Sequence, residues 1–120
     1  MRRLRIGHGQ GALEGRSRRV SMSSRMRYRL VNELEWRAGT VENVSASGMM
    51  FRVQDLDGLR DRDTPLELSF TAPSEIGGHG DTPVFCRAYI KRVLPAGEAA
   101  SFPAVAVRIT EYMVPIEQRE

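Results

Sequence analysis

The stretch Glu42-Asn43-Val44-Ser45-Ala46-Ser47-Gly48 decides how this chain folds. It combines three turn-forming residue types, asparagine, serine and glycine, in an Asn-x-Ser-x-x-Gly pattern. Apolar runs over residues 40–44 and 49–53 flank it, and both have the length of short strands. The sequence therefore predicts a tight turn between two antiparallel strands.

Further strands are predicted on both sides of this hairpin. Apolar and polar residues alternate over residues 28–36, 66–70 and 83–94, and residues 104–109 are almost continuously apolar. Ala38 and Gly39 are expected to form a turn, and residues 110–120 to begin a short helix that Pro115 interrupts. Six short strands without a strong helix predict an all-β fold, a small six-stranded antiparallel β-barrel, because closure removes exposed strand edges.

Charge divides the chain into two parts. Residues 1–29 hold nine arginines and one acid, a net charge of +8, whereas residues 30–120 carry a net charge of −5. The first segment is also rich in glycine and serine and lacks an apolar period. We therefore expect a flexible basic N-terminal arm over residues 1–24, a barrel domain over residues 25–114 and a short tail over residues 115–120.

Length and composition set the class of protein. A chain of 120 residues suits one compact domain. Its apolar runs are too short for a membrane-spanning helix, and the arginines at the start have no apolar stretch behind them, so we expect neither membrane insertion nor an export signal. The single cysteine, Cys86, lies in an apolar run and is expected in the core of a cytoplasmic protein.

A dense run of arginines, Arg25-Met26-Arg27-Tyr28-Arg29, precedes the hairpin. Arg25 and Arg29 form an Arg-x-x-x-Arg pair. The planar fork of arginine suits bidentate contacts with phosphate or with a guanine edge. The run is therefore a candidate contact surface for an anionic ligand.

These motifs together resemble the PilZ domain family, bacterial receptors for cyclic di-GMP built on a small six-stranded β-barrel. Arg25-x-x-x-Arg29 is similar to the family's Arg-x-x-x-Arg motif, which lies just before the first barrel strand. Asn43-x-Ser45-x-x-Gly48 is similar to its Asp/Asn-x-Ser-x-x-Gly motif. Residues 85–93 and 105–109 resemble two later strands of the family, although Ala88 stands where glycine is common.

The resemblance implies a ligand, cyclic di-GMP, and a set of ligand-binding residues. These are Arg25, Arg29, Asn43, Ser45 and Gly48, with Arg27 as a further candidate. Arginine can pair with the O6 and N7 atoms of guanine or stack on the purine, while Asn43 and Ser45 offer polar side chains and Gly48 permits a left-handed backbone. The arginine register stays open, because an alternative alignment pairs Arg27 with Ser23 and breaks the motif.

Three classes of function follow from these observations. The first is a receptor in which cyclic di-GMP orders the arm and thereby changes contact with a downstream protein that the sequence does not identify. The second is a PilZ-like interaction module without ligand binding, acting in motility or pilus assembly. The third is a nucleic-acid-binding barrel that uses the basic arm; the acidic balance of residues 30–120 disfavours it.

We expect no enzyme activity, no cofactor and no metal. The sequence shows no nucleophile paired with a base, and both histidines, His8 and His79, lie in glycine-rich segments. Asp55, Asp57 and Gly58 resemble the opening of a calcium loop, but no glutamate closes it.

Overall fold

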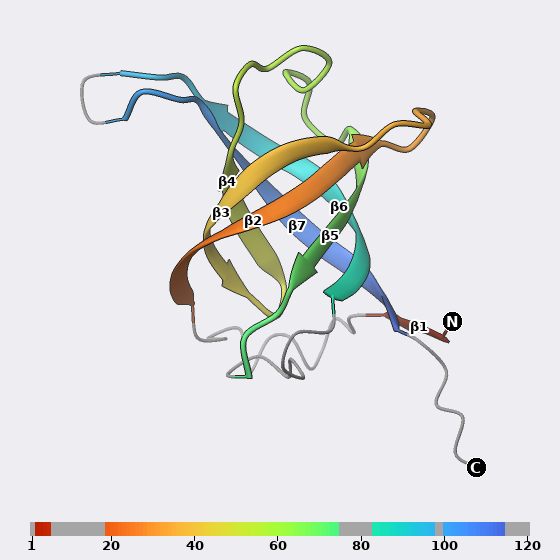
Figure 1. Cartoon of the computed structure of the whole chain (residues 1–120). Helices are drawn as coiled ribbons and strands as arrows, with labels where there is room; N and C mark the ends of the chain where they lie inside the picture. Colours follow the sequence, from red (N-terminus) through yellow and green to blue (C-terminus); the bar gives the residue numbers. More distant parts are fainter. Residues whose placement is uncertain (1, 6–18, 75–82, 98–99, 115–120) are drawn as a thin grey trace.

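The computed structural model describes residues 2–5, 19–74, 83–97 and 100–114. Seven strands organise them (Figure 1). Their bounds are β1 (Arg2–Arg5), β2 (Val20–Leu30), β3 (Arg37–Ser45), β4 (Gly48–Arg52), β5 (Pro65–Thr71), β6 (Pro83–Leu94) and β7 (Ala104–Val114).

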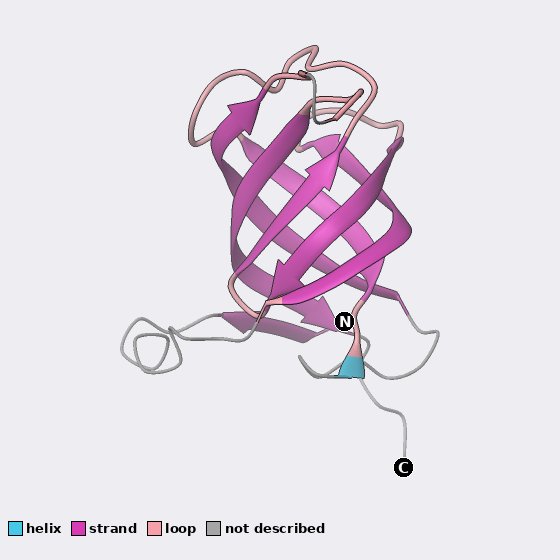
Figure 2. Cartoon of the chain, turned by 90° about the vertical axis from the view of Figure 1, so that its left-hand side faces the viewer, coloured by secondary structure: helices cyan, strands magenta, loops and turns pink. Residues whose placement is uncertain are grey.

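The strands β2 to β7 form a closed antiparallel barrel. The order across the sheet is β1-β7-β4-β3-β2-β5-β6, and an additional pairing between β6 and β7 closes the ring. Figure 2 shows the strands wrapping around one axis, with loops at both ends. This architecture confirms the predicted all-β, six-stranded antiparallel barrel. The short strand β1 lies outside the ring and pairs with the end of β7, from Arg2 opposite Val114 to Arg5 opposite Glu111.

Alternating side chains fill the interior of the barrel. In β2, Met26 and Tyr28 point inward while Arg25 and Arg27 are exposed, as the two-residue period of a strand requires. The ring of Tyr28 lies 5.2 Å from that of Phe51 on β4. The core also contains, among others, Val41, Val44, Met49, Leu66, Leu68, Phe70, Cys86, Ile90, Val105, Val107 and Ile109. Burial of Cys86 confirms its predicted place in the core.

The predicted strand over residues 28–36 is wrong. Strand β2 already begins at Val20 and ends at Leu30, and residues 31–36 form the hairpin that leads into β3. Glu33 closes this hairpin, because its backbone N–H donates to the carbonyl of Leu30 (2.9 Å) and its carboxylate accepts from the Leu30 N–H (3.3 Å). The turn lies at Val31 and Asn32, and of these only Asn32 is a turn-forming residue type, so the sequence marks the turn weakly.

Two local predictions are also corrected. Ala38 and Gly39 lie within β3 and not in a turn. Gly39 is instead a site of close packing, since a Cβ there would lie 2.9 Å from Met26 Sδ and 3.0 Å from the Arg52 carbonyl oxygen. The short helix expected from residue 110 is a strand, because β7 continues to Val114 and pairs with both β1 and β6.

Several expectations fall on segments beyond the described residues. Most of the predicted arm, the glycine-rich loop over residues 75–82 with His79, and the tail over residues 115–120 belong to this group. Residues 20–24, placed in the arm by the sequence, are part of β2.

Candidate functional site

The Asn-x-Ser-x-x-Gly motif forms the turn between β3 and β4 at one end of the barrel. Ser45 lies opposite Gly48, and Val44 lies opposite Met49 in the core. A register shift between Val41 and Asn43 interrupts the alternation of β3. Such a bulge re-aims the side chains that follow it.

Ser45 and Gly48 give the turn its internal structure. Ser45 is only 4% exposed, and its hydroxyl donates to the Gly48 carbonyl oxygen over a long distance of 3.5 Å. Among the described glycines only Gly58 has a positive φ, so the expected left-handed backbone at Gly48 is wrong. Gly48 instead permits close approach, because a Cβ there would lie 3.1 Å from the Val107 carbonyl oxygen.

Two hydrogen bonds from β7 hold the turn in place. The backbone N–H of Ile109 donates to the Ser47 carbonyl (2.9 Å), and the hydroxyl of Tyr112 donates to the Ala46 carbonyl (2.9 Å). Burial raises the pKa of Tyr112, and the neighbouring Cys86 raises it further, so the hydroxyl keeps its proton for this bond. The turn is therefore a rigid element, with Ala46 and Ser47 at its exposed tip.

Arg19, which lies immediately before β2, reaches this turn. Its Nη1 atom donates a short hydrogen bond to Asn43 Oδ1. Its Nη2 atom lies 3.7 Å from the position of a Cβ on Gly48. A guanidinium, a carboxamide and a close-packed backbone thus meet at one point on the surface.

Sequence reasoning missed Arg19. The signal that would identify it is the start of β2 at Val20, because a residue just before this strand lies near Asn43, which is opposite Ser21. Because the sequence pattern predicts that the first strand begins at Tyr28 and not at Val20, it points to Arg25, Arg27 and Arg29 instead.

The strand register places Arg25, Arg27 and Arg29 away from the turn. Ser21 is opposite Asn43, whereas Arg25 is opposite Thr40. At about 3.3 Å per residue, Arg25 lies roughly 13 Å and Arg29 roughly 26 Å along β2 from the residue that faces Asn43. The structure therefore brings together Asn43, Ser45 and Gly48, but not the three arginines expected beside them.

Arg29 has structural partners of its own. Its Nε donates to Glu67 Oε1 (2.9 Å), and its Nη1 donates to the Leu34 carbonyl (3.1 Å). The guanidinium also lies over the ring of Trp36, 4.4 Å from the centroid. These contacts attach the β2–β3 hairpin to β5.

Arg25 and Arg27 line an open groove with a volume of about 1020 Å³. It extends from β2 to the end of β4 and the loop that follows. Arg52 and Asp55 line it there, together with Phe102 from the segment before β7. Arg52 is already paired with the carboxylate of Glu42 (2.9 Å).

The described residues contain no group of three or more histidine, cysteine or acidic side chains placed to hold a metal ion. Burial raises the pKa of the Cys86 thiol, which keeps it in the protonated form. In the same part of the chain, no helix has the length and apolarity needed to span a membrane.

Fold and site together define a small closed antiparallel barrel with a polar arginine–asparagine cluster at its β3–β4 turn. A solved structure with the same fold is that of the Bacillus subtilis inhibitor of motility, MotI/DgrA, with a TM-score of 0.58 and 16% sequence identity. The match covers 76% of this chain and 40% of that one, so this chain corresponds to less than half of its neighbour. No family model and no curated protein matches the sequence.

Proposed function

We propose that this chain is a PilZ-like receptor domain that binds cyclic di-GMP at the β3–β4 turn and passes the signal to another protein. The observation that carries the proposal is the contact of Arg19 with Asn43 above Gly48. This contact places an arginine against the Asn-x-Ser-x-x-Gly turn, as the resemblance implies. The arginine is Arg19, which lies just before the first barrel strand, β2.

Each group has a distinct task in this proposal. The Arg19 fork binds the O6 and N7 atoms of a guanine or a phosphate, and Asn43 contacts a base edge. Ser45 is buried, so it holds the shape of the turn and does not face the ligand. Gly48 lets the turn pack closely against the Val107 carbonyl of β7, which holds the turn in place beside Arg19.

The same proposal gives the chain an adaptor role and no enzymatic one. Ligand binding at Arg19 fixes the end of the N-terminal arm, and the ordered arm alters contact with a cytoplasmic partner protein. The neighbour's description as an inhibitor of motility supports a link to motility.

Calorimetric titration with cyclic di-GMP, with GTP and cyclic AMP as controls, tests the proposal. We expect Arg19→Ala to weaken binding by at least about tenfold, the size of one lost bidentate contact. Arg60→Ala, which removes the same charge from an exposed loop, is the matched control and should leave binding unchanged. Equal affinities of the two variants would overturn the site assignment.

A ligand-free interaction module is the second candidate. The separation of Arg25 and Arg29 from the turn favours it, because among the residues that the structure describes only Arg19 then contacts the turn, where the resemblance implies a pair of arginines. Absence of binding by the unaltered protein in the same titration, up to tens of micromolar, would select this function.

A further inference from the structure

The outer face of β2, β5, β6 and β7 carries arginines and aromatic rings in register. Inward neighbours such as Leu68, Cys86 and Ala88 are buried in the core, so the residues between them point outward. The pairings of β2 with β5, β5 with β6 and β6 with β7 set these outward residues in three rows. The rows are Arg27, Ser69, Phe85 and Met113; Arg29, Glu67, Arg87 and Glu111; and Pro65, Tyr89 and Arg108.

Trp36 joins this face from the β2–β3 hairpin. The guanidinium of Arg29 lies 4.4 Å from its ring centroid and that of Arg27 lies 5.6 Å away. The ring of Phe85 is 6.3 Å from that of Trp36, in a tilted arrangement. In the row of Pro65, Tyr89 and Arg108, the guanidinium of Arg108 lies 5.9 Å from the ring centroid of Tyr89.

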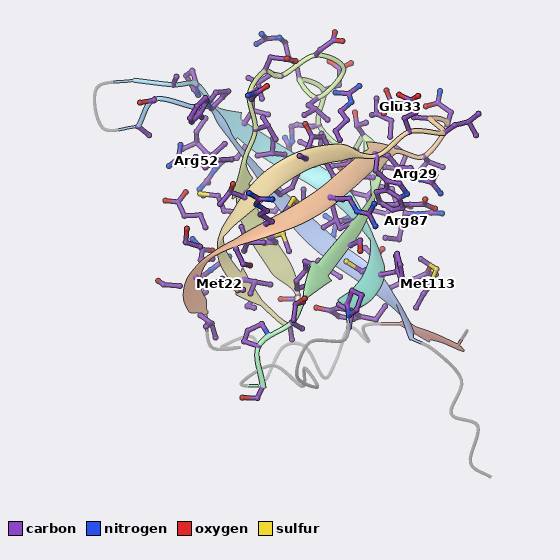
Figure 3. The ribbon with its side chains drawn as sticks, viewed as in Figure 1. Met22, Arg29, Glu33, Arg52, Arg87 and Met113 are labelled. Carbon is purple, nitrogen blue, oxygen red and sulfur yellow. The ribbon has the colours of Figure 1, made fainter. Side chains whose placement is uncertain are left out.

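Glu67 holds the centre of the face in place. It accepts from Arg29 (2.9 Å) and from Arg87 (3.5 Å). Figure 3 shows the side chains of Arg29 and Arg87 on the same side of the barrel. One carboxylate thus orients two guanidinium groups, whose side chains keep 27% and 29% of their exposure. The contacts fix the arginines and leave part of each side chain open to solvent.

We propose that this arginine–aromatic face, made of Arg27, Arg29, Trp36, Phe85, Arg87, Tyr89 and Arg108, binds single-stranded nucleic acid. Three strand spacings of about 4.8 Å and two row spacings of about 6.6 Å give it a size of roughly 14 by 13 Å. A sheet surface of this kind stacks two or three bases on aromatic side chains and guanidinium planes. Arginines at both edges then meet the phosphates of the backbone.

Two observations favour a nucleic acid over an acidic protein segment. The rings of Trp36, Phe85 and Tyr89 lie among the arginines, and stacking uses both kinds of group whereas an acidic segment needs the charge alone. The open groove also continues from the face, because Arg27 and Ser69 belong to both. Its volume of about 1020 Å³ gives a strand room to continue beyond the stacked bases.

Fluorescence anisotropy with labelled oligo-dT and oligo-U of roughly 15 nucleotides tests the proposal. The emission of Trp36, the single tryptophan of the chain, provides a direct reading of stacking in the unaltered protein. We expect binding with quenching of this emission. With about three phosphates contacted, affinity should fall roughly twentyfold between about 50 mM and about 200 mM KCl.

Variants localise the binding to the face. Phe85→Ala should weaken it at least about fivefold, with Phe85→Leu as a second variant that keeps apolar volume. Arg108→Ala should reduce the salt slope by about 0.7, because Arg108 is an exposed arginine at the edge of the face, whereas Arg60→Ala should not change it. Arg19→Ala should leave binding to oligo-dT intact, so failure of the cyclic di-GMP proposal and failure of this one are distinguishable.

Two results would overturn the proposal. One is the absence of anisotropy change up to about 100 μM protein at low salt, the weak end of non-specific binding. The other is competition by poly-glutamate at equal affinity without any quenching of Trp36, which would identify an acidic protein segment as the occupant.

Discussion

Replacing Gly39 by alanine tests whether the β3–β4 wall is packed as tightly as the structure shows. A Cβ at this position would lie 2.9 Å from Met26 Sδ, 3.0 Å from the Arg52 carbonyl oxygen and 3.4 Å from a ring carbon of Phe51. The Met26 side chain can rotate away, but the Arg52 carbonyl belongs to β4, which pairs with β3 at Thr40. The backbone must therefore give way.

The expected cost follows from two opposing effects. Overpacking a well-filled interior costs about 1–3 kcal/mol. Loss of glycine's freedom in the unfolded chain returns about 0.4–1 kcal/mol. We therefore expect Gly39→Ala to lower the free energy of unfolding by about 1–2 kcal/mol, equivalent to roughly 5–15 °C in melting temperature for a domain of this size.

Urea denaturation followed by circular dichroism provides the measurement, with an unchanged m-value as evidence that only stability has changed. Gly97→Ala is the matched control, because a Cβ there meets nothing within 4 Å. The control should be neutral or slightly stabilising. Equal stability of the Gly39 and Gly97 variants would show that the packing argument is wrong.

Three further predictions concern side chains described above. Arg29→Ala should destabilise the protein by about 1–2 kcal/mol, because it removes the ion pair with Glu67 and the stacking on the hairpin; a melting temperature equal to that of the unaltered protein would contradict this. The hydrogen bond from Arg37 lowers the pKa of Glu33, so the pair stabilises the fold above the ordinary carboxyl pKa of 4.5, and this contribution is lost as pH falls through the lower folded value. Glu33→Gln should therefore be less stable at neutral pH and flatten the acid limb of the stability profile, and an unchanged limb would exclude the pair as its cause. Cys86 should resist thiol reagents until the protein unfolds, because it is buried and protonated; rapid labelling of the folded protein would place it at the surface.

The sequence predicts the barrel well because one face of most strands is buried. The predicted strand over residues 83–94 has the same bounds as β6, where Cys86, Ala88 and Ile90 alternate with outward residues. The β3–β4 turn was likewise found from its own turn chemistry. Both signals are local, so pattern alone identifies them.

The first strand was missed because its signal is not local. Residues 20–25 are mostly polar and only Val20 and Met22 among them are apolar, so the alternation of this segment carries little apolar weight. The hairpin after Leu30 is closed by Glu33, which carries no ordinary turn signal. The misplaced strand also left Arg19 out of the predicted site and placed Arg25 and Arg29 beside the turn, from which the strand register separates them.

The pairing of β2 has a consequence for how the molecule opens. Arg27 and Tyr28 pair with both β3 and β5, whereas Val20, Ser21 and residues 24–26 pair with β3 alone among the described strands. Amide hydrogen exchange along β2 should therefore be graded, slow near Tyr28 and faster toward Val20. Local unzipping from this end would release Arg19 from the turn while the remaining strands keep their pairing, which couples access to the candidate site to the opening of one end of β2.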